Sequence, residues 1–297
     1  MSLKASLEKI TDIEMYWDSN LTNYSTFRLQ SHGDLLVVKS EEALAAVVKA
    51  LNHHQRAWRM IGWGANQVLL PKETDLLIQL DFKWDSTQFD EVRSSYHLPA
   101  SLGLNHLTSH ASKFGLKGWE ALTGIPASLG GAIYMNAGTA LGEIGALVRK
   151  VRIMNKLGEI REIEINASSF SYRKNHFVNP GDIIISATLV HLGTDEAIPA
   201  KIKNYLEYRR NSQPLATKNC GCVFKNYSRT RQAGRLLDLT GLKGLAVGAL
   251  RVSHRHANFM ENIGGAGSQD FHSLTELVNL QMRLHWGVEF ELEVKAV

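Results

Sequence analysis

The sequence predicts an α+β protein built from more than one subdomain. Its 297 residues are too many for one small core. Residues 34–61 read as a short apolar strand, a helix with apolar residues at helical spacing and a second strand, which predicts a β-α-β unit with a small parallel strand pair. Residues 151–165 read as an antiparallel hairpin with its turn at 155–158.

Further elements follow from the same periodicities. We expect strands at 75–80, 92–98 and 183–192, and helices at 102–114, 199–210, 233–239 and 274–286. Gly115 is placed to end the first of these helices. Residues 288–294 alternate strictly between apolar residues and glutamates, which predicts a strand with one buried face. Residues 1–20 show no clear core pattern and are interpreted as a lead-in segment.

The composition is that of an ordinary globular protein, with 44% hydrophobic and 21% charged residues. No run of eighteen apolar residues and no signal-peptide pattern is found, so we expect no membrane association and a cytoplasmic location. The formal net charge is only +4, and Lys and Arg are spread along the chain. This balance argues against a nucleic-acid-binding protein and favours a small anionic ligand.

Cysteine and histidine usage gives no indication of a metal site. Cys220 and Cys222 are separated by one residue, a spacing that does not easily allow an unstrained disulfide, so we expect free thiols in a reducing compartment. His254 and His256 lack a third ligand at usable spacing.

Two glycine-rich stretches carry most of the functional information. Residues 123–138 contain four glycines, a proline and an asparagine, a composition that predicts a loop whose backbone N–H groups hold a phosphorylated cofactor. The alternative is a turn that only connects two elements. Residues 58–70 read as a strand, a Gly-x-Gly-x-Asn turn and more apolar residues. This second stretch is neither a Rossmann fingerprint nor a Walker loop.

The two stretches resemble the flavin-binding segments of the UDP-N-acetylenolpyruvoylglucosamine reductase family, the MurB-type enzymes of peptidoglycan synthesis. The family's first loop reads Gly-x-Gly-Ser-Asn, and its second reads Ser-Gly-Ile-Pro-Gly-Ser-Val-Gly-Gly-Ala…Met-Asn-Ala-Gly, which residues 123–138 match nearly position for position. The cofactor-binding residues that the resemblance implies are Gly62, Trp63, Gly64, Ala65, Asn66, Gly124, Ile125, Pro126, Ser128, Gly130, Gly131, Asn136, Ala137 and Gly138.

A third segment resembles the family's Gly-Ser-x-Phe-Lys-Asn motif, in which the Ser delivers a proton to the substrate. Here Cys222 stands in the place of that Ser. A thiol can play the role, because its ordinary pKa of about 8.5 leaves it mostly protonated at neutral pH and makes it a far better acid than a hydroxyl. The alternative is that Cys222 is a small buried apolar residue.

Two further catalytic residues follow from the resemblance. Tyr172 and Arg173 match the family's Tyr-Arg-x-Ser-x-Phe, with Asn175 in place of the Ser. An Arg near the flavin would stabilise negative charge on an intermediate. Glu293 matches the second Glu of Leu-Glu-Pro-Glu-Val, a catalytic partner in the family, with Leu292 in place of the Pro. Without the resemblance, Arg173 would be interpreted as a surface residue and Glu293 as part of a solvated strand face.

The resemblance also implies how the substrate is held. Residues 253–262 resemble the family's Ser-x-x-His-Ala-Asn-Phe-x-x-Asn, and the diphosphate of a UDP-sugar would meet asparagines and a lysine. The implied substrate-binding residues are Tyr172, Lys225, Asn226 and Asn258. We expect no metal.

The fold that the resemblance implies is a two-subdomain FAD-binding fold of the vanillyl-alcohol-oxidase/PCMH type with a C-terminal α+β substrate-binding domain. The expected boundaries are 1–72 together with 287–297 for the first FAD-binding subdomain, 73–210 for the second, and 211–286 for the substrate domain. The short run between Phe177 and Ile183 leaves no room for a long insertion, as in the compact form of the family that lacks a substrate-covering tyrosine loop. We expect a monomer.

The implied activity is the reduction of the enolpyruvyl ether of UDP-N-acetylglucosamine to UDP-N-acetylmuramate, which serves the cell wall and with it cell shape and division. NADPH reduces FAD, and hydride then reaches the methylene carbon of the substrate. Arg173 and Glu293 stabilise the carbanionic or enolic intermediate, and Cys222 protonates the adjacent carbon. Two alternatives stay open: another FAD-linked oxidoreductase of the same fold, and a non-enzymatic relative that binds a flavin or a nucleotide sugar.

Overall fold

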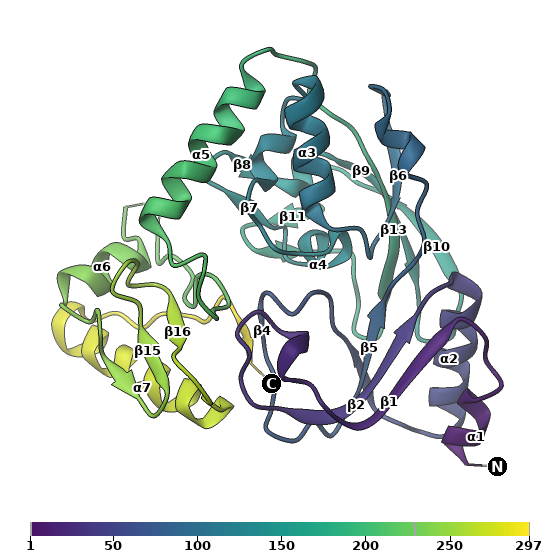
Figure 1. Cartoon of the computed structure of the whole chain (residues 1–297), viewed down its shortest axis with the longest axis horizontal. Coiled ribbons are helices and arrows are strands. Elements are labelled where there is room, and N and C mark those ends of the chain that lie inside the picture. Colours follow the sequence, from purple (N-terminus) through teal and green to yellow (C-terminus); the bar gives the residue numbers. More distant parts are fainter. Residues whose placement is uncertain (1, 229, 297) are drawn as a thin grey trace. The chain divides into compact units, whose positions relative to one another are not determined.

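The chain folds into two compact units, each assembled from several separate segments (Figure 1). The computed structural model describes residues 2–228 and 230–296. Unit 1 comprises Met1–Trp17, Asp34–Gly62 and Thr74–Leu206, and unit 2 comprises Asp18–Gly33, Trp63–Glu73 and Glu207–Val297. The chain therefore passes from unit 1 to unit 2 within the first glycine loop, after Gly62. The division into three domains at 72, 210 and 287 stays a prediction.

The first sheet has the strand order β1-β2-β5-β3. Its strands are β1 (Ile13–Asn20), β2 (His32–Val38), β5 (Leu76–Leu80) and β3 (Trp58–Met60). Strand β5 pairs in parallel with both β2 and β3. The predicted β-α-β unit is therefore present, but its two strands are not neighbours, because β5 lies between them. The first three residues of β5 are fully buried, as expected for a central strand of a parallel sheet.

Helix α2 (Glu41–His53) packs on this sheet through one apolar face. The Ser40 hydroxyl accepts the Ala43 N–H at 3.2 Å and caps its first turn. The prediction of a lead-in without a core at 1–20 is wrong. Helix α1 (Leu3–Leu7) contacts α2, and Leu7 is fully buried in the same core. A single turn with one buried leucine is too short to show a periodicity.

The second sheet has the order β10-β9-β13-β6 and is antiparallel throughout. Its strands are β10 (Ile160–Glu164), β9 (Val148–Met154), β13 (Ile183–Leu189) and β6 (Tyr96–Pro99). The predicted hairpin at 151–165 and the strand that begins at Ile183 are confirmed. The strand expected at 92–98 is shorter, since it begins only at Tyr96.

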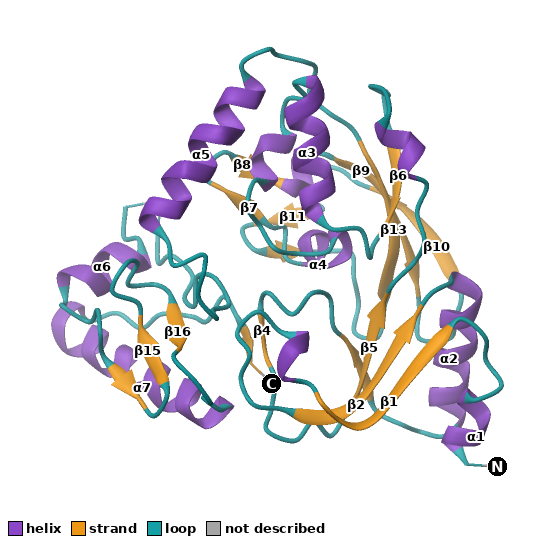
Figure 2. Ribbon diagram, in the orientation of Figure 1, coloured by secondary structure: helices purple, strands orange, loops and turns teal. Residues whose placement is uncertain are grey.

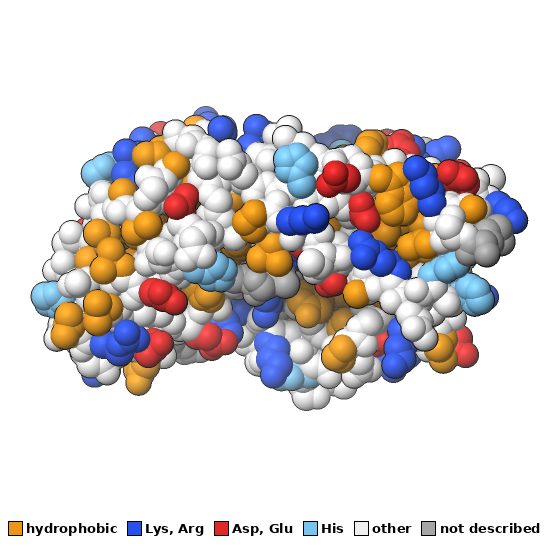
Figure 3. Space-filling view, turned by 90° about the horizontal axis from the view of Figure 1, so that it is seen from below, with side chains coloured by type: hydrophobic (Ala, Val, Ile, Leu, Met, Phe, Trp, Pro, Cys, Tyr) orange, Lys and Arg blue, Asp and Glu red, His pale blue; other side chains and the backbone are white. Residues whose placement is uncertain are grey.

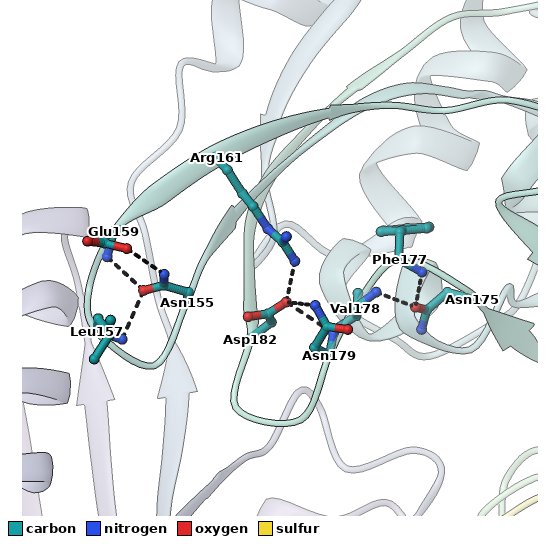
Figure 4. A network of polar contacts seen from close by, with 9 residues as sticks. All are labelled: Asn155, Leu157, Glu159, Arg161, Asn175, Phe177, Val178, Asn179 and Asp182. Carbon is teal, nitrogen blue, oxygen red and sulfur yellow. Dashed lines mark hydrogen bonds and ion pairs between the residues drawn. The ribbon is translucent and has the colours of Figure 1, made fainter.

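Polar side chains form hydrogen bonds that order the turns of the second sheet (Figure 4). In the β9–β10 turn, Asn155 Oδ1 accepts two N–H groups of its own turn, at 2.8 and 3.0 Å. Before β13, the Asp182 carboxylate accepts the Asn179 N–H at 3.0 Å and the Arg161 guanidinium at 2.6 Å. These bonds satisfy turn N–H groups locally, and those of Asp182 order the short connection between Phe177 and Ile183.

The remaining elements of unit 1 are short, apart from the two helices α3 and α5. They are η2 (Ser86–Phe89), α3 (Leu104–Phe114), η3 (Trp119–Leu122), α4 (Leu129–Tyr134), β7 (Gly138–Thr139), β8 (Gly142–Glu143), η4 (Ile144–Ala146), β11 (Phe170–Ser171), β12 (Lys174–Asn175) and most of α5 (Ile198–Ser212). Gly115 ends α3 with φ +69°, so the predicted left-handed cap is confirmed.

Unit 2 has its own apolar core between helices and short strands (Figure 2). Its elements are η1 (Thr22–Tyr24), β4 (Gln67–Val68), α6 (Ala233–Leu239), β14 (Ala246–Val247), β15 (Leu250–Val252), β16 (Met260–Asn262), α7 (Ser268–Trp286) and β17 (Lys295–Ala296). The predicted helix at 274–286 is confirmed, but α7 begins earlier, at Ser268. In its first turns Phe271 is a buried apolar residue among polar ones, so these turns lack a visible apolar stripe.

The prediction of a strand at 288–294 is wrong. These residues form one isolated bridge, from Leu292 to Phe224, before the two-residue strand β17. The alternation is nevertheless real in burial, because Val288, Phe290 and Val294 are buried. The pattern thus predicted which side chains enter the core, but not how the backbone is bonded.

The charged side chains are mixed in sign on the face drawn in Figure 3, where Lys and Arg lie among Asp and Glu. Such an interspersed surface differs from the continuous basic stripe of a nucleic-acid-binding protein. Within residues 2–228 and 230–296, no helix is both long and apolar enough to span a membrane.

A buried histidine lies in the aromatic core of unit 1. The His110 ring stacks on Phe89 with centroids 4.6 Å apart, and its Nε2 lies 2.9 Å from the Tyr96 hydroxyl. His110 is 3% exposed. Burial, and next the positive charge of Lys113, lower the pKa of His110 from its ordinary value.

We predict that stability falls as the pH drops below the ordinary histidine value of about 6.5. Below that pH the unfolded chain binds a proton at His110 that the folded chain binds less readily. The melting temperature of His110→Gln should be lower than wild type at pH 7.5 but should depend less on pH between 7.5 and 5.5. The control is His97→Gln, which removes an exposed imidazole from β6. An unaltered pH dependence in His110→Gln would contradict this.

Candidate active site

The predicted site residues divide between the two units. Unit 1 holds Gly62, Gly124, Ile125, Pro126, Ser128, Gly130, Gly131, Asn136, Ala137, Gly138, Tyr172 and Arg173. Unit 2 holds Trp63, Gly64, Ala65, Asn66, Cys222, Lys225, Asn226, Asn258 and Glu293.

In unit 1 the two glycine-rich stretches meet at Gly62. A Cβ atom on Gly62 would lie 2.9 Å from Ser128 Oγ, so a side chain at this position would displace the hydroxyl. That hydroxyl also accepts the Gly131 N–H at 3.3 Å and caps α4. The Gly62 carbonyl is fixed from the other direction by Gln79 of β5, whose Nε2 donates to it at 2.7 Å.

Helix α4 corrects the expectation that residues 123–138 form a loop throughout. The helix begins after Ser128 and buries Leu129, Ala132 and Ile133. Gly130 allows it to pack closely, because a Cβ there would lie 2.8 Å from the Ala100 Cβ. The glycines were interpreted as loop formers, but in α4 they serve close approach instead.

Asn136 joins the end of the second glycine-rich stretch to its surroundings. It is 2% exposed and left-handed, with φ +45°. Its Oδ1 accepts the Gly145 N–H at 3.0 Å, and its Nδ2 donates to Glu143 Oε2 at 2.8 Å and to the Ser171 carbonyl at 3.0 Å. The side chain therefore orders the protein around it, and a direct contact with a cofactor stays a prediction.

Arg173 is held against the same stretch. One guanidinium nitrogen donates to the Gly138 carbonyl at 3.2 Å, and another lies 4.0 Å from Glu143 Oε1. Its side chain is 18% exposed, and the guanidinium carbon lies 5.2 Å from the centre of the Tyr172 ring. The backbone is left-handed, with φ +55°, which is uncommon outside glycine and is found at functional sites. These features argue against an ordinary surface arginine.

In unit 2 the first glycine loop presents a row of backbone donors. Within the described residues, the N–H groups at 63–66 donate no hydrogen bond. Gly64 is left-handed, with φ +64°, and a Cβ there would lie 2.2 Å from the Tyr24 carbonyl oxygen. The backbone N–H of Thr26 donates to the Gly64 carbonyl at 3.3 Å. The buried Thr26 hydroxyl has no hydrogen-bond partner among the described residues. Successive free N–H groups suit a phosphate-bearing ligand.

The loop is bonded directly to the C-terminal segment. Asn66 Nδ2 donates to the Glu293 carbonyl at 3.1 Å, and the Lys295 N–H donates to the Asn66 carbonyl at 3.0 Å. The second bond belongs to the parallel pairing of β4 with β17. The predicted positions Asn66 and Glu293 are thus brought together.

Cys222 lies in a segment that is held on both sides. The Val223 N–H donates to the Asn258 carbonyl at 2.9 Å, and the Glu293 N–H donates to the Val223 carbonyl at 2.8 Å. The Asn258 amide accepts the Phe224 N–H at 2.9 Å and donates to the Phe224 carbonyl at 2.8 Å. Asn258 is 3% exposed, so its side chain holds the segment, and a contact with a diphosphate stays a prediction.

The neighbouring predicted residues also have protein partners. Lys225 forms an ion pair with Glu291 at 2.5 Å, and Asn226 Oδ1 accepts the Ala233 N–H at 3.0 Å at the start of α6. The Lys225 pair involves an exposed glutamate, and such pairs contribute little to stability. Exchange of this partner for a ligand phosphate would therefore cost little.

The two cysteines lie in different environments. Both are free thiols, as expected, and Cys220 is buried whereas Cys222 is partly exposed. Burial raises the pKa of the Cys220 thiol, and the nearby Cys222 and Glu293 add to this effect. Cys220 is therefore a neutral thiol, and Cys222 is the one that a ligand can reach. Within the described residues, no group of three or more His, Cys, Asp and Glu is arranged to hold a metal ion.

Sequence reasoning missed two residues beside the predicted ones. Glu143 contacts both Asn136 and Arg173, and Thr26 lies against Gly64. Glu143 follows the second glycine-rich stretch closely in the sequence, which is the signal that could have drawn attention to it. Thr26 lies far from the loop in the sequence and carries no such signal.

Comparison with known proteins gives two family matches. The C-terminal domain of UDP-N-acetylenolpyruvoylglucosamine reductase matches residues 213–297, and an FAD binding domain matches residues 35–164. Among individual relatives, the UDP-N-acetylenolpyruvoylglucosamine reductase of Heliobacterium modesticaldum is 31% identical over 280 residues, which is 93% of this chain and 88% of that protein. That of Bacillus pumilus is 29% identical over 99% of this chain and 96% of its own length.

A solved structure matches as well. The crystal structure of UDP-N-acetylenolpyruvylglucosamine reductase from Thermus caldophilus superposes with a TM-score of 0.78 and 29% identity, covering 96% of this chain and 98% of that one. The expected FAD-binding α+β fold is thereby confirmed.

We predict that Gly64→Ala destabilises the protein more than Gly241→Ala. Both glycines are left-handed, at φ +64° and +75°, but a Cβ on Gly241 meets nothing within 4 Å. Left-handed strain alone costs on the order of 1–3 kcal/mol, and the clash with the Tyr24 carbonyl adds a further ~1–3 kcal/mol at position 64. Thermal unfolding of both variants measures the difference. Equal losses would show that the close approach of loop and carbonyl is unimportant.

Proposed function

This chain belongs to the UDP-N-acetylenolpyruvoylglucosamine reductase family, and we propose that it reduces the enolpyruvyl ether of UDP-N-acetylglucosamine. One substrate, one NADPH and one proton would give UDP-N-acetylmuramate, a precursor of peptidoglycan, and NADP⁺. The observation that carries the proposal is the run of hydrogen bonds from Asn66 to Glu293 and from Glu293 to Val223, at 3.1 and 2.8 Å. This run links a glycine loop, the backbone of Glu293 and the segment of the proposed acid within unit 2.

We propose FAD as the resident cofactor. The free N–H groups at 63–66 are suited to its diphosphate. In unit 1, the cofactor would be held along Gly62 and the residues from Gly124 to Gly138, where glycines leave the backbone accessible. When bound, FAD supplies the hydride-transfer chemistry, and the protein supplies binding and orientation.

The proposed catalytic residues have distinct tasks. Arg173 supplies a fixed positive charge for the negative charge that develops beside the substrate carboxylate. Glu293 is the catalytic partner, and its backbone is anchored at both its N–H and its carbonyl. Cys222 donates its thiol proton to the carbon next to the one that receives hydride.

The substrate would be held by Tyr172, Lys225, Asn226 and Asn258. Lys225 is a compact cation suited to a diphosphate, and Tyr172 is 47% exposed and offers an aromatic face. Asn258 would contribute mainly by holding the segment of Phe224. We further propose that the enzyme is a monomer, that it works in the cytoplasm, and that it prefers NADPH to NADH.

We predict that purified protein is yellow and that, under anaerobic conditions, it oxidises NADPH over many turnovers only when the enolpyruvyl UDP-sugar is present. Without the sugar, NADPH oxidation should stop once the bound flavin is reduced. Reductant should be included to protect the thiols. Flavin without substrate-dependent turnover would reject the reductase and favour another FAD-linked oxidoreductase or a binding protein.

A second prediction concerns the proton donor. Cys222→Ser should retain measurable turnover, whereas Cys222→Ala should lose about 10²- to 10⁴-fold, the usual contribution of a general acid. Cys220→Ala removes the other thiol and serves as the control, with turnover close to wild type. Steady-state rates measure all three, and full activity of Cys222→Ala would remove Cys222 from the mechanism.

A further inference from the structure

We propose that Glu143 is a positioning residue that holds the Arg173 guanidinium in its working orientation, a role that rests on the proposed function of Arg173. The Glu143 carboxylate lies between two side chains of unit 1. Oε2 accepts Asn136 Nδ2 at 2.8 Å, and Oε1 lies 4.0 Å from an Arg173 nitrogen. Through Glu143, the end of the second glycine-rich stretch is coupled to the arginine.

The backbone places this carboxylate. Strands β7 and β8 pair Gly138 with Glu143 in register. A Cβ on Gly138 would lie 2.2 Å from the Gly142 carbonyl and 2.7 Å from the Glu143 Cα, so only glycine permits this approach. The same Gly138 carbonyl accepts Arg173 at 3.2 Å. The hairpin thus presents a carbonyl and a carboxylate to one guanidinium.

A guanidinium takes a defined orientation when an acceptor and a negative charge face different nitrogens of its fork. Its planar, fork-like donors align with acceptors, unlike the point charge of a lysine. The Gly138 carbonyl accepts one N–H, and the negative charge of Glu143, 4.0 Å from another nitrogen, adds an electrostatic restraint on the guanidinium. The Arg173 side chain is 18% exposed and that of Glu143 39%, so water competes only in part for this contact.

Backbone strain indicates that the arrangement serves function. Asn136 and Arg173 are both left-handed, at φ +45° and +55°, and both contact Glu143. Non-glycine residues persist in this region where their surroundings impose it, and they gather at functional sites. A surface ion pair kept for stability alone would not require two strained partners.

Glu143→Gln tests this role, because glutamine can still accept the Asn136 bond but loses the charge facing Arg173. With FAD-loaded enzyme, we expect the rate of reduction by NADPH to be unchanged and the oxidation of reduced enzyme by the enolpyruvyl UDP-sugar to fall about 10- to 100-fold, as misplacement of a catalytic group does. The melting temperature should stay near that of wild type. Stopped-flow absorbance measures each half-reaction separately.

The matched control is Glu159→Gln, which removes an exposed carboxylate from the β9–β10 turn of the same unit. Both half-reactions should keep wild-type rates in that variant. Equal rates for Glu143→Gln and wild type in the substrate half-reaction would overturn the role of Glu143, as would an equal loss in both half-reactions.

A readout without turnover separates this role from the proposed function. The side-chain Nε–H signal of Arg173, assigned by its loss in Arg173→Lys, should broaden or shift in Glu143→Gln and stay unchanged in Glu159→Gln. If wild type did not reduce the sugar, the proposed function would fail, and the nuclear magnetic resonance result alone would decide whether Glu143 orders Arg173. An unchanged signal in Glu143→Gln would reject that ordering.

Discussion

The close approach of Gly62 to Ser128 is the constraint on which the candidate site of unit 1 depends. Since a Cβ on Gly62 would lie 2.9 Å from the Ser128 hydroxyl, glycine at this position allows the first glycine loop to leave the sheet directly beside the start of α4. Gln79 holds the Gly62 carbonyl from β5, the strand that lies between β2 and β3. The strand β5 therefore helps to fix the point where the two glycine-rich stretches meet.

In unit 2, asparagine side chains hold the backbone segments that carry the predicted site residues. The Asn258 amide donates to and accepts from the backbone of Phe224, and the Asn279 amide does the same for Phe290, at 3.1 and 3.0 Å. One amide can satisfy both polar groups of a residue, which matters where buried segments are too short to form a ladder. The segments that carry Cys222 and Glu293 are thereby ordered without a regular sheet.

The sequence was sufficient for elements whose periodicity repeats within a short window, such as α2, the β9–β10 hairpin and the capped end of α3. It was insufficient where a partner comes from elsewhere in the chain. The position of β5 between β2 and β3 depends on pairing that no local pattern contains. The apolar alternation at 288–294 correctly indicated burial, but the bonds of that segment go to distant residues, among them Asn66 and Asn279.

The same limit applies to the candidate site. The resemblance identified which residues to place, and the glycines could also be argued from their composition. Asn136 and Asn258 were expected as ligand contacts, yet the structure shows their amides bonded to the protein. Asparagine suits both tasks chemically, so its residue type alone could not distinguish a ligand contact from a bond that orders the backbone.

The way Cys222 is held bears on how a thiol can serve as the proposed acid at this position. Hydrogen bonds that hold its segment run through the backbone of Val223 and Phe224 and through Asn258 and Glu293, so replacing oxygen by sulfur at position 222 leaves that frame intact. Two residues away, Cys220 is buried and its pKa is raised, which keeps it neutral and poorly reactive. The frame thus exposes one thiol and encloses the other. Because a thiol is a stronger acid than a hydroxyl, a cysteine here would change the strength of the proposed acid while preserving its position.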